Sequence, residues 1–543
     1  MERQSVRKIC KLKKHKEMPI SGGEDLIIMK LNYRKTMGKI IAAAIFGIFF
    51  YLTFCSFCFS YQFSLRYNES ASFMTDVWYL HLFILIPVVL LFKFLPEALL
   101  KRQEKAKMIS MIFLLFVMTM ATAAGFIWVN ANPCIPCADQ RDVFRAAIRI
   151  PLGLYSYFRP DGYLGVYQFQ IGLVTLFEWI LHLAGQTDYH VIMYANVCCL
   201  PVIIFAGYQA LWVCYENRRM QVLYCIFMLF CFPLLFYTPF IYGEIFAVTT
   251  GISLIWMVLL IIRRQKIRYL LPAVFFAVIG VWSKGSNWIP IIASVIFLLL
   301  YSVRRKQILL AICAVIIVLV PISGNKMLVS YYENLSGTEL NQGVPLTAWI
   351  AMGLHQEYNE KDGWYDAYNY NTYADSNFQK KETDQISRRY IAYRLGEMAE
   401  DKKGALLLFQ NKILTQWDAP DYESLAANSF FRTRPTGFVY EMYFGQLHWN
   451  MEAVMDEYQW ILYLGVLMGA FAAIKKNREP FYHLIFMLTV LGGFLFTLIW
   501  EAKTRYTMVY LIYMIPCAVY GWEKFLSKME EKEYLKKVSQ LLF

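Results

Sequence analysis

Ionisable residues gather where the third long apolar run of the chain ends. The segment ANPCIPCADQRDVF (131–144) directly follows the apolar run 111–129 and contains Asp139, Arg141 and Asp142, with Arg145 just beyond it. On a helix, a spacing of three places both carboxylates on one face. Charges beside hydrocarbon cost free energy unless they are solvated, paired or used in a reaction. Two interpretations are open: an interfacial helix whose acids balance its arginines, or a site where a carboxylate is the general base for an acceptor hydroxyl and the arginines hold a phosphate.

A Cys-x-x-Cys pair, Cys134 and Cys137, precedes these acids. Such a pair forms a local disulfide, a reactive dithiol or half of a metal site. The outer segments contain no second Cys or His pair at ligand spacing, so we expect a structural disulfide or two unreacted thiols, and no metal site. The sequence leaves open whether the protein uses a divalent cation.

Three later segments place further charges between apolar runs. Glu244 lies in IYGEIFAV, Lys284 in VWSKGSNW, and Glu501, Lys503 and Arg505 in LIWEAKTRYTMVY. The first two are either ordinary loop charges or part of a cleft shared with the acids described above. In the last segment an ion pair between Glu501 and Arg505 is one interpretation. A phosphate clamp is the other, because the planar donor fork of arginine suits a phosphate.

The composition indicates a polytopic membrane protein, because 58% of the 543 residues are hydrophobic and only 17% are charged. A bilayer span needs roughly 17 to 25 residues. Apolar runs of about this length lie near 39–61, 78–97, 108–129, 190–214, 219–239, 242–262, 268–283, 287–303, 308–323, 457–474, 480–499 and 506–522, and a less uniform run covers 163–184. The net charge of +13 does not point to nucleic acid, because the basic residues form short clusters between these runs.

The basic clusters predict the topology. They are KRQEKAK (101–107), ENRR (216–219), RRQK (263–266), RRK (304–306) and KKNR (475–478), and all are expected to face the cytoplasm. Counting crossings then places 130–160, 242–244 and 324–456 outside. An odd number of crossings must separate residue 160 from ENRR, yet two apolar segments lie between them. We expect the polar-containing segment 163–184 to be re-entrant or interfacial; the alternative is that ENRR faces outside.

The expected fold class is all-α, with about 12–13 transmembrane helices and one mostly helical extracytoplasmic domain. The predicted divisions are a cytoplasmic basic leader (1–38), two N-terminal spans (39–107), a transmembrane core with the outer loop 130–160 (108–323), the extracytoplasmic domain (324–456), the C-terminal spans (457–522) and a cytoplasmic tail (523–543). The predicted location is the cell membrane, with the active site on the extracytoplasmic face.

The order of these segments resembles the GT-C superfamily of polytopic glycosyltransferases, over roughly residues 108–522. The similarity is carried by the Asp at a membrane exit, followed by YQFQIGL (167–173), YGE (242–244), SKGSNW (283–288), PLTAWIAMGL (345–354), GWY (363–365) and WEAKTRY (500–506). The branch it resembles most is the protein mannosyltransferase-like one of Gram-positive bacteria, which depends on dolichyl- or polyprenyl-phosphate sugars. Relatives of this kind show Tyr-Pro before the Gln of YQFQIGL, whereas here Gln168 follows Tyr167, so the bend that a proline imposes is expected to be absent.

The resemblance implies a sugar transfer from a polyprenyl-phosphate donor to an extracytoplasmic glycan, lipid or protein acceptor, with inversion and with no ATP. It implies that Asp139 is the catalytic base, with Asp142 as second choice and Glu244 as a second acidic position. Lys284 and Arg505 would contact the lipid phosphate. The remaining residues assigned to substrate binding are Arg141, Arg145, Tyr167, Gln170, Glu501, Lys503 and Tyr506.

Two other functions remain open at this level. One is a lipid-linked glycan flippase or transporter, although such proteins tend to show internal repeats and mid-membrane charges, and neither is clear here. The other is a glycan polymerase or ligase, which would share the same outer-face chemistry. The chain lacks the Walker-type glycine loop, HExxH and GxSxG, so ATP-driven pumping, zinc proteolysis and serine hydrolysis are not favoured.

Overall fold

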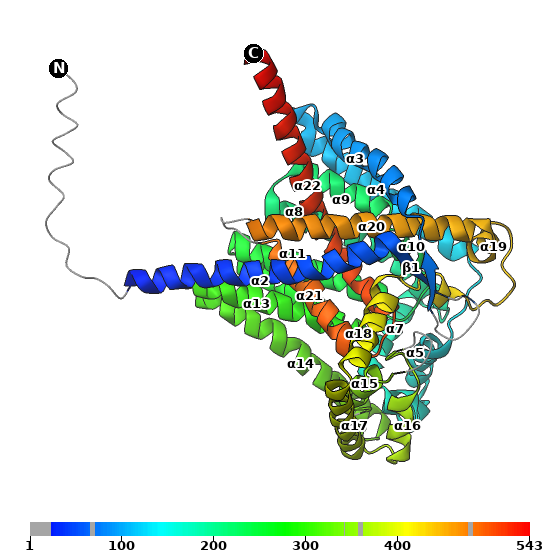
Figure 1. Cartoon of the computed structure of the whole chain (residues 1–543). Helices are drawn as coiled ribbons and strands as arrows, with labels where there is room; N and C mark the ends of the chain where they lie inside the picture. Colours follow the sequence, from blue (N-terminus) through cyan, green and yellow to red (C-terminus); the bar gives the residue numbers. More distant parts are fainter. Residues whose placement is uncertain are drawn as a thin grey trace.

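The computed structural model describes residues 23–63, 65, 71–340, 343–356, 362–475 and 482–542. Most of the predicted basic leader (1–22) and three residues of the KKNR cluster (476–478) lie outside the described residues. Within them the fold is α-helical, as predicted, apart from one antiparallel hairpin of β1 (Phe59–Phe63) and β2 (Ala71–Thr75). Figure 1 shows this hairpin at the end of the long first helix, α2 (Gly23–Cys58).

Eight helices of the described chain are long and apolar enough to cross a membrane, or nine if a bent pair counts as one span. Each carries one of the predicted apolar runs. They are α2, α3 (Trp78–Leu100), α4 (Ala106–Ala131), α8 (Tyr189–Tyr215), α11 (Glu244–Arg264), α13 (Trp288–Arg305), α14 (Ile308–Ser336) and α20 (Gln446–Lys475). The polytopic membrane character predicted from composition therefore has a matching set of helices.

The other four predicted runs have a different form. Runs 268–283 and 480–499 lie on the shorter apolar helices α12 (Leu270–Ser283) and α21 (Leu484–Ile499), and run 506–522 lies on α22 (Arg505–Leu542). Run 219–239 is divided between α9 (Arg218–Leu229) and α10 (Phe232–Phe236). Pro233 occupies the first turn of α10, a position where its missing N–H costs no helical hydrogen bond.

The segment 163–184 is bent, although no proline lies at the bend. The helices before and after Tyr167, which include α6 (Tyr163–Val166) and α7 (Ile171–Ala184), meet at 101°. The expectation of a missing bend is therefore wrong, because Tyr167 itself leaves the helical conformation, with φ −111° and ψ 58°. The start of the segment bonds to Tyr242 through Gln170, and the helix that follows its end begins against Phe144 of α5 (Ala138–Arg149). Tyr242 in turn bonds to Asp139 of α5, so both ends lie near α5, and this geometry favours the expected re-entrant form.

Three of the basic clusters meet at the opposite end of the helices. Arg263 of RRQK pairs with Glu216 of ENRR at 2.6 Å. Arg305 of RRK donates to the carbonyl of Ile262, which joins RRK to RRQK. The ENRR cluster therefore shares a side with the other two, as the crossing count expects, while the identity of that side as cytoplasmic stays a prediction.

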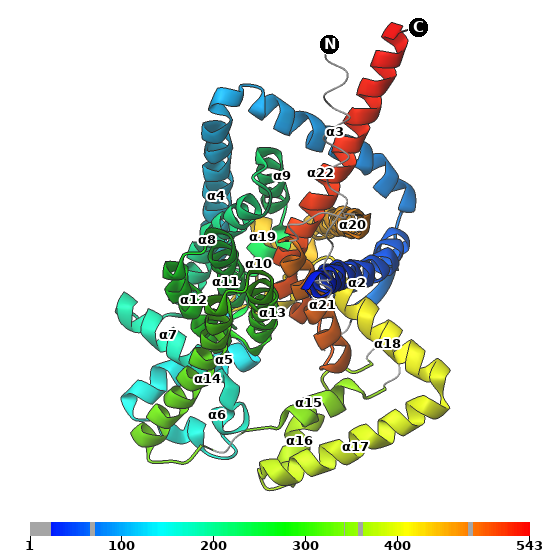
Figure 2. The ribbon, with the colours of Figure 1, turned by 90° about the vertical axis from the view of Figure 1, so that its left-hand side faces the viewer.

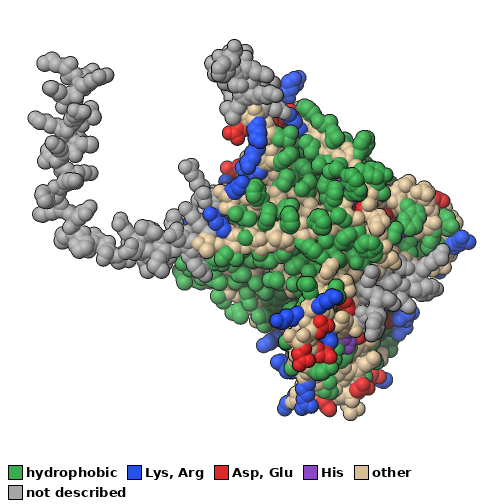
Figure 3. Space-filling view, viewed as in Figure 1, with side chains coloured by type: hydrophobic (Ala, Val, Ile, Leu, Met, Phe, Trp, Pro, Cys, Tyr) green, Lys and Arg blue, Asp and Glu red, His purple; other side chains and the backbone are tan. Residues whose placement is uncertain are grey.

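The polar segment between α14 and α20 is mostly helical. It contains α15 (Leu346–Gly353), α16 (Tyr368–Asp375), α17 (Lys380–Glu400), α18 (Lys402–Trp417) and α19 (Gly437–Phe444). In Figure 2, α15 to α17 lie beneath the helices α11, α13 and α21, and α18 lies to the right of α21. Figure 3 shows charged side chains gathered over the region of α15 to α17, whereas the surface over α2 and α20 is largely hydrophobic. This contrast agrees with a water-exposed portion attached to a membrane-embedded bundle.

Candidate active site

The candidate site is centred on Tyr242, which is 9% exposed and lies at the entrance to α11. The next residue, Gly243, has φ +92°, and a Cβ there would lie 2.3 Å from the carbonyl oxygen of Ser283. Only glycine fits this approach, because other residues would be both strained and in collision. The tight turn at Gly243 therefore lets the Tyr242 side chain and the first helical residue, Glu244, lie close together.

The hydroxyl of Tyr242 connects two of the predicted site residues. It donates to Oδ2 of Asp139 at 3.0 Å and accepts from Nε2 of Gln170 at 2.7 Å. The amide of Gln140 holds the neighbouring backbone, because its Oε1 accepts from the N–H of Ile241 at 3.0 Å. Asp139 lies in the first turn of α5, and the helix predicted there is confirmed. Its carboxylate is thus fixed by a hydrogen bond while remaining partly exposed.

Glu244 and Lys284 form an ion pair beside this tyrosine. Glu244 is fully buried, and its Oε1 pairs with Nζ of Lys284, while its Oε2 has no hydrogen-bond partner among the described residues. The ammonium also lies 5.3 Å from the ring centre of Tyr242 and 5.6 Å from that of Tyr506. Two residues assigned from separate loops therefore meet, 40 positions apart in the chain.

Arg505 also lies against the same two aromatic rings. Its guanidinium carbon is 5.3 Å from the ring centre of Tyr242 and 5.6 Å from that of Tyr506. Its Nε is buried without a hydrogen-bond partner in the described chain. The Arg505 backbone N–H donates to Oε2 of Glu423 at 3.3 Å, and the Tyr506 hydroxyl donates to Oε2 of Glu501 at 3.0 Å.

Three cationic side chains, those of Lys284, Arg505 and Lys503, lie near one another in the candidate site. Burial lowers the pKa of Lys284, and the nearby charges of Arg505 and Lys503 lower it further, while Glu244 opposes the shift. Three positive side chains near one another form an anion site when neighbouring acids do not fully neutralise them. Because guanidinium and ammonium groups donate well to phosphate oxygens, the arrangement suits a phosphate group.

Sequence reasoning missed two residues that support the site. Glu423, which is 5% exposed, follows Tyr422, and both have left-handed backbones with φ of 64° and 52°. Such strained positions persist where the surrounding structure over-determines them, often at functional sites. Lys412 is fully buried and donates from Nζ to the carbonyls of Gly353 at 2.5 Å and Trp500 at 2.7 Å. The crowding of acids in DAPDYES (418–424) was the only sequence signal for Glu423.

Other predicted site residues make contacts of their own. Asp142 pairs with Arg141 at 3.5 Å, both with partly exposed side chains, and Arg145 is exposed on α5. Tyr167 packs at 6.1 Å from the ring centre of Trp349 on α15. Lys503 is buried, and its backbone N–H donates to Oε1 of Gln416 at 3.3 Å. The ion pair between Asp142 and Arg141 supports the interfacial-helix interpretation for these two residues.

The Cys-x-x-Cys pair has two free thiols rather than a disulfide. Burial raises the pKa of Cys134 to about 12 and also raises the pKa of Cys137. A thiol that resists ionisation is a poor nucleophile. The segment instead pairs with the chain near residue 431, since the N–H of Ile135 donates to the carbonyl of Phe430 at 2.8 Å.

The chain is similar to a solved structure, although sequence comparisons find no match. No protein-family model matches the chain, and no curated protein matches it. Among solved structures, the chain is similar to the crystal structure of the Archaeoglobus fulgidus oligosaccharyltransferase tethered with an acceptor peptide, at 12% identity and a TM-score of 0.42. The match covers 78% of this chain and 50% of that protein, so this chain corresponds to about half its length.

Proposed function

We propose that the protein is a membrane glycosyltransferase that moves a sugar from a polyprenyl-phosphate donor to a hydroxyl of an extracytoplasmic glycan, lipid or protein acceptor. The observation that carries this proposal is the placement of the Asp139 carboxylate on one side of Tyr242 and of Lys284 and Arg505 against its ring. Such a transfer needs a base for the acceptor and cations for the departing phosphate, and both are present around one side chain.

In this mechanism the acceptor oxygen forms a bond to the anomeric carbon of the sugar as the bond from that carbon to the phosphate oxygen breaks. Asp139 takes the acceptor proton, and polyprenyl phosphate leaves with the electron pair. The hydrogen bond from Tyr242 orients the Asp139 carboxylate and leaves its other oxygen available. A single displacement of this kind inverts the configuration at the anomeric carbon.

Arg505 is the group proposed to hold the departing phosphate. Its Nε has no hydrogen-bond partner in the described chain, so this donor is available to an oxygen of a ligand. The rings of Tyr242 and Tyr506 lie beside the guanidinium and restrict its position. A preorganised donor of this kind stabilises charge that develops on the phosphate in the transition state.

Lys284 has a different role in the proposal. It already pairs with Glu244, so its charge is largely balanced in the resting protein. As negative charge grows on the departing phosphate, the ammonium, with its flexible stem, contacts both the carboxylate and the phosphate. Glu244 therefore positions Lys284 rather than accepting the acceptor proton.

The decisive experiment is an assay of the purified protein with a panel of polyprenyl-phosphate sugars and mixed acceptors. Sugar-dependent release of polyprenyl phosphate, lost in Asp139→Asn, is the expected result. A polymerase or ligase would release polyprenyl diphosphate from lipid-linked glycans instead. A flippase would move a labelled lipid across a vesicle membrane with no release, and either outcome would overturn the proposal.

A further inference from the structure

A second cluster of ionisable groups lies outside the candidate active site, where the N-terminal hairpin meets α20. Asp76 lies between β2 and α3, His81 in the first turn of α3, and Asp456 on α20. One ligand atom from each of the three side chains lies within 4.8 Å of the others. Side chains from two parts of the chain, 375 positions apart between His81 and Asp456, therefore point to one place.

The histidine of this cluster is buried without hydrogen bonds. His81 is 2% exposed, and neither ring nitrogen has a hydrogen-bond partner within the described residues. Its Nδ1 lies 3.0 Å from Oε2 of Glu457 and its Nε2 lies 3.9 Å from Oδ2 of Asp456. Buried polar groups are almost always hydrogen-bonded, so an imidazole whose two nitrogens lie in ion-pair range of carboxylates but make no hydrogen bond in the described chain needs an explanation.

Each surrounding carboxylate also has at least one oxygen without a hydrogen-bond partner in the described chain. Oδ2 of Asp76, Oδ1 of Asp456 and Oε2 of Glu457 are buried with no hydrogen-bond partner in the described chain. Asp418 is fully buried, and both of its carboxylate oxygens lack a partner there. In the described structure no lysine or arginine forms an ion pair with these four acids, and two of them, Asp456 and Glu457, lie in ion-pair range of His81. Several buried carboxylates with one imidazole are costly without a further positive charge.

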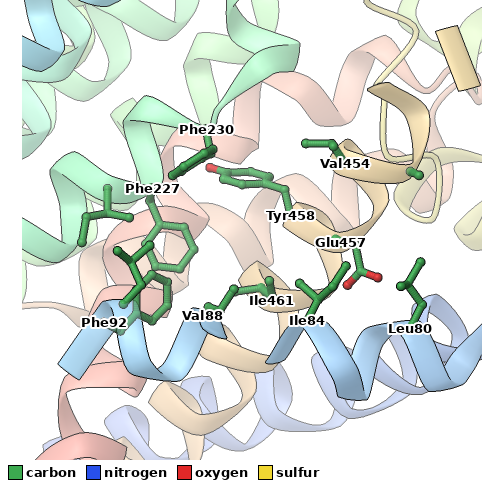
Figure 4. A pocket seen from close by; sticks show the side chains of 13 residues that line it. Leu80, Ile84, Val88, Phe92, Phe227, Phe230, Val454, Glu457, Tyr458 and Ile461 are labelled. Carbon is green, nitrogen blue, oxygen red and sulfur yellow. The ribbon is translucent and has the colours of Figure 1, made fainter. Parts of the chain in front are cut away.

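An apolar cavity beside Glu457 raises the free-energy cost of its buried charge. Figure 4 shows the cavity, of about 270 Å³, between α3, α9 and α20, with the Glu457 carboxylate directed at the α3 wall near Leu80. Glu457 is the one charged side chain among the lining residues, and Phe92, Phe227 and Ile461 are typical of the others. Because hydrocarbon walls do not solvate a carboxylate, the charge must be neutralised from the His81 side.

We propose that Asp76, His81 and Asp456 bind a divalent transition-metal ion, Mn²⁺ or Zn²⁺, with Glu457 and Asp418 as additional ligands or balancing charges. Ligand atoms around such an ion lie about 3 to 4 Å apart, given metal–ligand distances near 2.1 Å, so the 4.8 Å spread requires only a small closure of side chains. Carboxylates with one imidazole suit these ions better than Ca²⁺, which prefers oxygen ligands alone.

The position of the cluster gives the ion a structural role. Oδ1 of Asp76 accepts a hydrogen bond from Oγ of Ser60 at 2.9 Å, and the Tyr61 N–H donates to the carbonyl of Asp418 at 2.7 Å. The cluster therefore lies where the hairpin, α3, α20 and the 418–423 loop meet. That loop also carries Glu423, which accepts from the backbone of Arg505. The ion would therefore attach the first two spans to the loop behind the candidate active site. None of its three proposed ligands belongs to that active site.

The test uses the full chain in detergent, treated with chelator and then incubated with Mn²⁺, Zn²⁺ or Ca²⁺ and freed of excess ion. Metal content and thermal unfolding are measured on the monodisperse fraction. We expect about one equivalent of Mn²⁺ or Zn²⁺, a higher unfolding temperature with either ion, and at least a tenfold weaker affinity in Asp456→Asn and His81→Gln. His190→Gln, which alters an exposed histidine paired with Asp188, is the matched control and should bind normally.

Three outcomes would overturn the proposal. The parent could bind no ion, it could bind Ca²⁺ alone, or both variants could keep the full equivalent, which would indicate an adventitious ion elsewhere. Because Asp456→Asn is nearly isosteric, it still tests the proposal if His81→Gln fails to fold. Because metal content is measured without turnover, failure of the glycosyltransferase proposal would leave this result unaffected.

Discussion

The hydroxyl of Tyr242 donates to the carboxylate of Asp139 at 3.0 Å across 103 positions of the chain. The same ring lies within 5.3 Å of both the Lys284 ammonium and the Arg505 guanidinium. In a group transfer, such a carboxylate can deprotonate the acceptor, and the two cations can hold the departing phosphate. Each role can be tested separately by substitution.

Asp139→Asn is expected to reduce sugar transfer at least about a hundredfold, the usual loss for a missing general base. The protein should still fold, because asparagine is nearly isosteric and can accept from the Tyr242 hydroxyl. Initial rates and size-exclusion profiles provide the measurement. Asp142→Asn is the matched control on the same helix and should stay within a few-fold of the parent. Near-parental rates for Asp139→Asn would exclude its role as base.

Arg505→Lys keeps the charge but loses the planar donor fork, so we expect a sharp fall in turnover with an unchanged unfolding temperature. Glu501→Gln should have a milder effect, because Glu501 accepts a hydrogen bond from Tyr506 and an amide oxygen can also accept one. Steady-state kinetics and thermal unfolding are compared for both variants. Equal losses of activity together with equal losses of stability would assign Arg505 a purely structural role.

Breaking the Glu244–Lys284 pair from one side should lower the free energy of unfolding by about 3–5 kcal/mol, because a buried charge loses its partner. Glu244→Gln and Lys284→Met are the single variants, and the double variant should recover much of the stability. Denaturation of all three in detergent measures the coupling. If the double variant regains stability but not transfer, Lys284 acts on the donor; if it regains both, the pair is structural.

Stability should rise with pH above neutrality because of Lys412. Burial lowers the pKa of Lys412 to about 7, with Glu501 and Asp362 opposing the shift, whereas an unfolded lysine titrates near about 10.4. Below pH 7 both states are protonated and the burial cost is constant. Between the two values the unfolded state binds the extra proton, so the free energy of unfolding increases with pH. The unfolding temperature of the parent relative to Lys412→Met should therefore climb from about pH 7 to about pH 10, and a flat difference would refute the shift.

The topology can be checked with cysteines placed at the two ends of the helices. Gln265 is exposed beside the joined ENRR and RRQK clusters, and Asp161 is exposed just before the bent segment. With an impermeant maleimide applied from outside, Asp161→Cys should react and Gln265→Cys should react only after permeabilisation. The unsubstituted chain is the control for native thiols. Labelling of Gln265→Cys in intact cells would place the basic clusters outside and reverse the assignment.

The sequence by itself determined the helical membrane architecture, because long apolar runs satisfy their backbone groups in lipid only as helices. It also identified the helix that carries Asp139, through charges placed where an apolar run ends. It did not show that run 219–239 breaks before Pro233, or that Tyr167 bends its segment without a proline, since both depend on packing.

Only the tertiary structure decided which charges meet. Asp139 bonds to Tyr242, while Asp142, three residues away, turns to Arg141, a difference that helical spacing alone cannot give. The cluster of Asp76, His81 and Asp456 could likewise not be predicted from the sequence, because its members come from distant segments with no ligand spacing. The physical reason is that interactions between ionisable groups depend on distance and burial, and helix packing sets both.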